Sequence, residues 1–134
     1  MKHAAIFAIA ALLAGPALAG DPAKGESEYK KCKSCHAIIA PDGTEIQKGG
    51  KTGPNLWGVV GRPVASVEGF KYGPSILAVG ESGKVWDEAS LVEYAKDPAA
   101  WLKTTLDDSG AKSKMTFKLP KGADDVVAYL ATMK

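Results

Sequence analysis

The segment Cys32-Lys33-Ser34-Cys35-His36 constrains this chain more than any other stretch of its sequence. Two cysteines separated by two residues and followed at once by a histidine form the attachment signature of a c-type haem. The spacing suits the chemistry, because two thioethers anchor one edge of a porphyrin while the adjacent imidazole reaches the iron. The motif therefore predicts that Cys32 and Cys35 are haem thioethers and that His36 is an axial iron ligand.

A Cys-x-x-Cys pair has other uses, and each makes its own demand on the sequence. A thioredoxin-type redox pair is expected among alternating strands and helices, which the residues around Cys32 do not suggest. A structural zinc site needs four ligands, whereas the chain after residue 19 offers two cysteines and one histidine. These alternatives, and a simple disulfide, stay open at this point but fit less well than haem attachment.

The beginning of the chain has the form of a secretory signal peptide. Lys2 and His3 precede an apolar run over residues 4–13, and Ala17-Leu18-Ala19 is a small-x-small cleavage site. The run is too short for a membrane anchor, which needs roughly 20 apolar residues, and no later stretch is apolar enough. We expect residues 1–19 to be removed and residues 20–134 to form a single exported domain.

Charge and length narrow the functions open to this domain. The whole chain carries 17 Lys and Arg residues against 15 Asp and Glu residues, so a strongly basic nucleic-acid binder is excluded on bulk charge. A domain of this size buries only about two-thirds of its surface on folding. A large apolar cofactor at its centre would therefore help such a chain considerably.

Capping residues and helical periodicity predict an all-α domain. Asp21-Pro22 places a cap before a proline at the first helical position, so a first helix should run to about Lys33 and deliver the cysteine motif. Gly25 within it indicates either a weak first turn or a close crossing with another helix. Further helices are expected over residues 75–79, from 87 to about 96, for a turn or two from 98, and from 122 or 124 onward.

Residues 37–72 contain glycine or proline in every candidate element and show no convincing strand. Structureless loops longer than about 15 residues are uncommon in compact domains. The segment is also too apolar for ordinary disorder, because it contains Leu56, Trp57, Val59 and Phe70. We therefore expect it to wrap a cofactor.

A haem iron has a second axial position, which few side chains of the exported domain can fill. His36 is the one histidine after residue 19, and Met133 falls on the apolar face of the last predicted helix, where packing explains it. Met115 lies in a polar loop without helical periodicity. Because histidine–methionine ligation is an established haem arrangement, we expect Met115 to be the second ligand. With both axial positions filled, the iron would have no open site, which favours an electron carrier. In an enzyme or a gas sensor, Met115 would have to dissociate from the iron.

These segments together resemble the class I c-type cytochromes, and most closely the bacterial cytochromes c2. The resemblance covers essentially all of residues 20–134 and implies the small cytochrome c fold, in which helices and long loops wrap around one covalent haem c. It also implies that the first and last helices cross near Gly25 and Tyr129. The matching segments are Gly-Asp-Pro-Ala-Lys-Gly at 20–25, the cysteine motif, Lys-Thr-Gly-Pro-Asn-Leu at 51–56, Gly-Val-Val-Gly-Arg at 58–62, Trp86, Tyr94, Lys114-Met115 and Ala128-Tyr129-Leu130.

The resemblance implies roles for further residues of the haem site. The carbonyl of Pro54 would accept a hydrogen bond from the His36 ring and set its orientation. Tyr72 and Trp86 would hydrogen-bond a haem propionate, and Arg62 would help to neutralise that edge.

On the other side of the haem, the resemblance places Tyr94 beside the sulfur of Met115, where it would tune the ligand. Ser113 stands where the family usually has threonine and keeps a hydroxyl group there. For Trp101, simple packing in the hydrophobic core is as good an interpretation as a role in the haem site.

The resemblance further implies a monomeric one-electron carrier of the periplasm rather than an enzyme. Such a carrier takes electrons from a quinol-oxidising, cytochrome bc1-type complex and passes them to a photosynthetic reaction centre or a terminal oxidase. Docking would use lysines around the exposed haem edge, which attract acidic partners. The positions that match are Lys33, Lys51, Lys103, Lys114 and Lys118.

Overall fold

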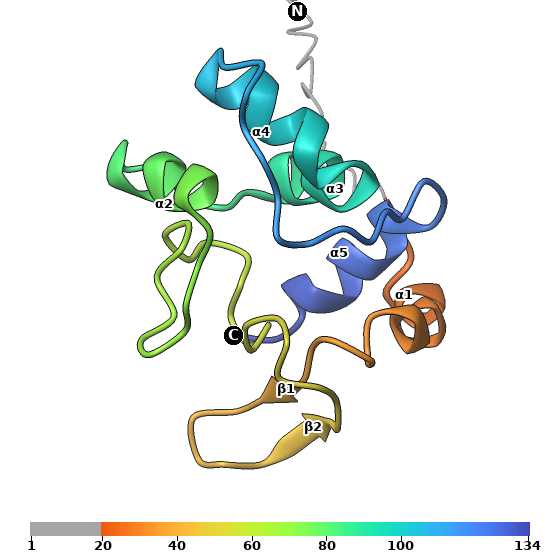
Figure 1. Ribbon diagram of the computed structural model, residues 1–134. Coiled ribbons are helices and arrows are strands. Elements are labelled where there is room, and N and C mark those ends of the chain that lie inside the picture. Colours follow the sequence, from red (N-terminus) through yellow and green to blue (C-terminus); the bar gives the residue numbers. More distant parts are fainter. Residues whose placement is uncertain (1–19) are drawn as a thin grey trace, which may run out of the picture.

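The computed structural model describes residues 20–134, and the predicted signal peptide with its cleavage site lies outside the described residues. The described chain contains five α-helices, a 3₁₀ turn and one two-stranded ribbon (Figure 1). In chain order these are α1 (Pro22–Glu28), the 3₁₀ turn (Tyr29–Lys31), β1 (Ile38–Ile39), β2 (Glu45–Gln47), α2 (Pro74–Glu81), α3 (Glu88–Lys96), α4 (Pro98–Leu106) and α5 (Ala123–Ala131). Within this part, none of the helices combines the length and apolar character needed to cross a bilayer.

The helices pack in a chain of contacts that begins where the two ends of the domain meet. Helix α1 lies against α5, α3 packs on α5 and α4, and α2 contacts α4 (Figure 1). The β1–β2 ribbon lies at the opposite end of the molecule from α4 (Figure 1). The long irregular segments 48–73 and 107–122 connect these elements, and the predicted helical architecture is confirmed.

The α1–α5 contact is a close crossing of two helix backbones. Gly25 is buried, and a Cβ atom added to it would lie 1.9 Å from the carbonyl oxygen of Asp125 and 2.8 Å from Cβ of Tyr129. The main-chain N–H of Asp21 also donates to Oδ1 of Asp125 at 2.8 Å. Of the two explanations for a glycine in the first helix, the close crossing is therefore correct.

The structure corrects two local predictions. The first helix ends at Glu28 and continues only as the 3₁₀ turn, whereas the short helix predicted from residue 98 is α4. The prediction of no strand in residues 37–72 is wrong for β1 and β2, which pair antiparallel. A turn closes this ribbon, because the Ala40 N–H donates to the Thr44 carbonyl at 2.9 Å and Gly43 has a φ of 89°.

The N-terminus of α3 carries a capping box, which supports a pH-dependent prediction. Oδ1 of Asp87 accepts the Ser90 N–H at 2.7 Å, while Oγ of Ser90 accepts the Asp87 N–H at 3.2 Å. The hydrogen bond from Ser90 holds the pKa of Asp87 below its ordinary value. The cap is therefore at full strength above the unfolded-state pKa and is lost as the pH falls through the folded-state pKa.

We expect Asp87→Ala to lower the free energy of unfolding by about 1 kcal/mol at neutral pH, the usual cost of removing such a cap. The difference from the unmodified protein should shrink as the pH falls below the ordinary range of an aspartate, because protonation weakens the same cap. Urea unfolding at a series of pH values measures both effects. A difference that stays constant down to pH 2 would contradict the assignment of the cap to the carboxylate.

Candidate cofactor site

A cavity of about 680 Å³ lies at the centre of the fold, within the size range of small-molecule and cofactor sites. Its walls come from the cysteine motif, the long segment 51–73, helices α3 to α5 and the 112–119 loop. The structure brings all ten predicted site residues to this one cavity: Cys32, Cys35, His36, Pro54, Arg62, Tyr72, Trp86, Tyr94, Ser113 and Met115.

The cysteine motif forms a tight turn at the edge of the cavity. The main-chain N–H groups of Cys35 and His36 both donate to the Cys32 carbonyl, at 3.2 and 2.9 Å. Both cysteines are free thiols that line the cavity. Burial, with a smaller contribution from Cys35, raises the pKa of Cys32 to about 11. A redox dithiol needs the opposite shift, so the redox-pair interpretation does not suit this turn.

His36 is buried and held in one orientation. Its Nδ1 lies 2.8 Å from the carbonyl oxygen of Pro54, which can only accept, so Nδ1 carries the proton and Nε2 is free to bind a metal. Burial lowers the pKa of His36, and the nearby Arg62 acts in the same direction. The ring is therefore neutral, as an iron ligand must be.

Gly53 packs directly against the face of this ring, a role that its place in the sequence does not predict. A Cβ atom at position 53 would lie 2.3 Å from Cε1 of His36, so any side chain there would displace the imidazole. The Gly53 N–H donates to the Cys35 carbonyl at 2.7 Å, and this hydrogen bond connects Gly53 to the cysteine motif. The glycines and prolines of residues 37–72 indicate an irregular backbone, but only the fold places Gly53 beneath the ring.

The two methionines of the described chain occupy different environments. Met115 is half-buried and lines the cavity, and the Ser113 hydroxyl donates to the Met115 carbonyl at 2.8 Å. Met133 is buried in the hydrophobic core and does not line the cavity. The arrangement agrees with the interpretation of Met133 as a packing residue and leaves Met115 as the thioether within reach of the cavity.

Arg62 places a half-buried cation on the cavity wall. Its Nη1 donates to the carbonyl oxygens of Asn55 and Trp57, at 2.9 and 3.0 Å. Its Nε is buried and has no hydrogen-bond partner among the described residues. Tyr72 lines the same cavity, and its hydroxyl accepts the Val67 N–H at 2.9 Å. A buried donor without a partner is costly, so this wall is suited to an anionic group.

Three aromatic rings form a cluster at one wall of the cavity. Trp86 and Tyr94 line it, with centroids 5.1 Å apart, while Trp101 packs behind both at 5.0 and 5.5 Å. Burial raises the pKa of Tyr94, and hydrogen bonding to Ser113 partly offsets this. Tyr94 therefore remains a neutral phenol at physiological pH. Trp101 does not line the cavity, which agrees with its interpretation as a core residue.

The chemistry of the lining fits a covalently attached haem. It combines two thiols, a neutral imidazole, a thioether and a half-buried guanidinium with an apolar wall formed by Val59, Leu91, Leu102, Val126, Val127 and Leu130. A zinc site fits less well, because residues 20–134 contain no cluster of three or more His, Cys, Asp or Glu side chains that could hold a metal.

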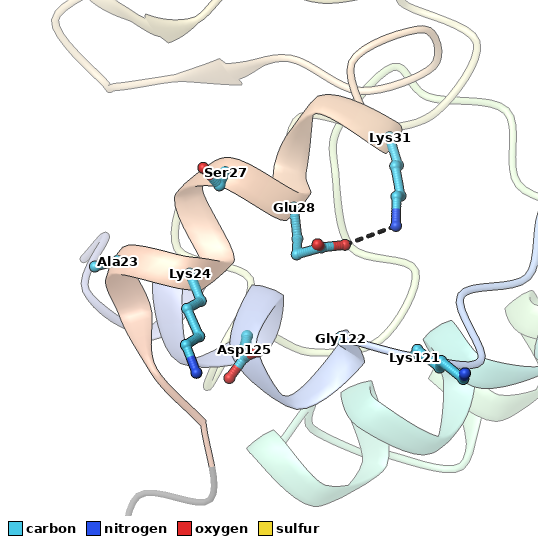
Figure 2. A pocket seen from close by; sticks show the side chains of 8 residues that line it. All are labelled: Ala23, Lys24, Ser27, Glu28, Lys31, Lys121, Gly122 and Asp125. Carbon is cyan, nitrogen blue, oxygen red and sulfur yellow. Dashed lines mark hydrogen bonds and ion pairs between the residues drawn. The ribbon is translucent and has the colours of Figure 1, made fainter.

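The structure separates the five predicted docking lysines. Lys51 and Lys114 line the cavity, whereas Lys33 and Lys103 do not, and Lys118 is paired with Asp97 at 3.2 Å. Three further lysines, which the sequence analysis missed, line the cavity as well: Lys31, Lys71 and Lys112. Lys31 belongs to the 3₁₀ turn, where its Nζ pairs with Glu28 at 2.8 Å (Figure 2). Lys71 and Lys112 come from two separate loops, so no local pattern in the sequence marks the three lysines.

Comparison with known proteins identifies close relatives. The chain is 60% identical to cytochrome c2 of Rhodobacter capsulatus over 124 residues, which cover 92% of this chain and 90% of that protein. It is 61% identical to cytochrome c-550 of Paracoccus versutus over 136 residues, covering 98% of this chain and 88% of the relative. No protein-family model matches the chain.

Solved structures agree with these sequence relatives. The structure of Rhodobacter capsulatus cytochrome c2 superposes with a TM-score of 0.83 at 61% identity, covering 84% of this chain and 97% of that one. Ferric cytochrome c-550 from Paracoccus versutus gives a TM-score of 0.83 at 63% identity, with coverage of 85% and 98%. The long segments around the cavity thus belong to a known architecture.

Proposed function

The chain belongs to the cytochrome c2 family of class I c-type cytochromes, and on that premise we propose that it is a periplasmic shuttle between membrane-bound electron-transfer complexes. Members of this family are electron carriers with a single covalently attached haem c, and they are not enzymes. When bound, the haem supplies an iron that alternates between the ferric and ferrous states. The observation that best supports the shuttle is the meeting of the cysteine motif, His36 and Met115 at one cavity.

In this proposal Cys32 and Cys35 would form the two thioethers, and His36 and Met115 would bind the iron. Pro54 accepts the His36 Nδ1–H and keeps Nε2 available. The methionine favours the ferrous state and raises the potential relative to a second histidine. Because the protein would supply both iron ligands, the site would change little on gaining an electron and would leave no position for a substrate.

The other cavity residues are proposed to hold the haem propionates and the methionine. Arg62, with its unpartnered Nε, would neutralise the propionate edge together with Tyr72 and Trp86. Tyr94 and Ser113 would fix the loop around Met115, in keeping with the hydrogen bond from the Ser113 hydroxyl.

Export forms a separate part of the proposal. The signal-like residues 1–19 would be removed, and residues 20–134 would act in the periplasm as a soluble monomer. Electrons would pass from a cytochrome bc1-type complex to a reaction centre or a terminal oxidase.

One measurement on protein purified from its own periplasm tests attachment and export together. The intact mass should equal residues 20–134 plus one haem, and the ferric spectrum should contain the charge-transfer band of a methionine–iron bond. A mass without haem would refute the haem site, a mass that includes residues 1–19 would refute the cleavage, and a missing band would refute Met115 as ligand.

Docking is proposed to use the lysines at the mouth of the cavity. Lys51 and Lys114 line it together with the exposed Lys71 and Lys112, and such a group would speed encounter with an acidic partner without tightening the complex. Lys33, Lys103 and Lys118 would extend this face outside the cavity.

We expect Lys51→Glu with Lys114→Glu to slow association with a bc1-type complex by about tenfold at low ionic strength, and less as salt rises. Lys30→Glu with Lys48→Glu is the matched control, because it changes net charge equally at exposed positions that do not line the cavity. Stopped-flow kinetics at several salt concentrations compare the two. Equal slowing by both double variants would assign the effect to net charge and contradict the docking face.

A further inference from the structure

The Tyr29 side chain is completely buried, yet it carries a hydroxyl group that core packing does not require. Tyr29 begins the 3₁₀ turn after α1 and has 0% of its surface exposed. Its ring packs against Tyr129 of α5, with centroids 6.0 Å apart and planes tilted by 58°. A phenylalanine would fill the same space, so the hydroxyl calls for its own explanation.

The hydroxyl donates to the main-chain carbonyl of His36 at 2.9 Å, in a buried hydrogen bond. Within residues 20–134, no second donor reaches this oxygen. Gly49 covers the carbonyl from another side, since a Cβ atom added there would lie 1.9 Å from the oxygen. A water molecule therefore has little room to replace the phenol if its hydroxyl is removed.

With this contact, His36 is held at three of its polar groups. Its N–H donates to the Cys32 carbonyl at 2.9 Å, its Nδ1 donates to the Pro54 carbonyl at 2.8 Å, and its carbonyl accepts from Tyr29. The first bond closes the cysteine turn and the second orients the ring. The third connects the same residue to the α1–α5 crossing, where Gly25 and Tyr129 meet.

We propose that the Tyr29 hydroxyl is a positioning group for His36, which fixes the main chain of the ligand residue and thereby the direction of its imidazole. The inference rests on the proposed role of His36 as iron ligand and adds a residue that lies outside the cavity lining. The carbonyl oxygen of His36 can only accept, so the phenol is the donor in this hydrogen bond.

The test compares Tyr29→Phe with Tyr129→Phe in the complete haem-loaded protein. Both changes remove one phenolic oxygen and keep the ring. The Tyr129 hydroxyl accepts from Nε2 of Gln47 at 3.0 Å and, within residues 20–134, does not hydrogen-bond to His36, so this variant controls for loss of a hydroxyl at the same helix crossing. Proton NMR of the ferrous protein follows the exchange of the His36 Nδ1–H, and that of the ferric protein follows the shifted His36 signals.

Tyr29→Phe should accelerate exchange of the Nδ1–H by about tenfold, the usual scale for a buried hydrogen-bonding group left without its partner, and should move the ferric His36 signals. Tyr129→Phe should leave both unchanged. If Tyr29→Phe lowers thermal stability but leaves exchange and shifts as in the unmodified protein, the hydroxyl only packs and the proposal is wrong. Absence of any iron-shifted His36 signal in the unmodified protein would instead refute the ligand assignment itself.

Discussion

Replacing Met115 with leucine should lower the midpoint potential on the order of 0.2 V, within the ~0.8 V range over which axial ligands set haem potentials. The physical reason is that a thioether stabilises ferrous iron, whereas a leucine of similar volume provides no ligand. The vacated position should also admit exogenous ligands such as imidazole or cyanide. Potentiometric titration measures the first effect, and spectral titration with the added ligand measures the second.

Met133→Leu is the matched control for this substitution. Met133 is buried in the core outside the cavity lining, and a swap that conserves volume usually costs less than 1.5 kcal/mol. It should therefore change stability slightly and leave the potential and the sixth position unchanged. If the potential fell in Met133→Leu and not in Met115→Leu, the ligand assignment would have to be exchanged between the two residues.

Gly25→Ala should destabilise the fold strongly, although alanine is the better helix former. Helix propensity favours the substitution by about 1 kcal/mol. Against this, the new Cβ would lie 1.9 Å from the Asp125 carbonyl oxygen, and the contact is with backbone that cannot rotate away. Overpacking of this kind typically costs 1–3 kcal/mol and occasionally more, and this overlap is severe, so we expect a net loss of about 3 kcal/mol.

Thermal unfolding of the haem-loaded protein should show this loss as a decrease in Tm of roughly 10 °C or more. Gly110→Ala provides the comparison, because position 110 is an exposed loop site where a new Cβ approaches only the side chain of Asp108, at 3.2 Å. That variant should unfold near the temperature of the unmodified protein. Equal stability of the two variants would mean that α1 and α5 tolerate separation, contrary to the geometry of their crossing.

Much of the site could be predicted from sequence because its chemistry uses few residue types. After residue 19 the chain has two cysteines, one histidine and two methionines, so the motif predicts Cys32, Cys35 and His36, and elimination favours Met115 as the second ligand. All four line one cavity, while their bonds to iron stay predictions. The crossing at Gly25 was also accessible, since a glycine inside a helix needs a reason.

Features that depend on the meeting of distant segments could not be predicted in this way. Strands β1 and β2 have two and three residues, too few for an alternating pattern to emerge. The lysines at the cavity mouth come from separate loops, so Lys71 and Lys112 carry no local signal. The hydroxyl of Tyr29 is likewise indistinguishable from a packing ring until the cysteine turn brings the His36 carbonyl to it.

The central cavity also has a consequence for how the protein matures in the cell. Leu102, Val126 and Leu130 belong to the hydrophobic core and also form the cavity wall. The core is therefore completed by the haem, and a bound group stabilises the native state alone. Before attachment, the polypeptide should be loosely folded, with Cys32 and Cys35 accessible for reaction with haem and the chain open to proteases. Haem attachment would then decide which molecules survive, because only molecules that carry haem become compact enough to resist proteolysis.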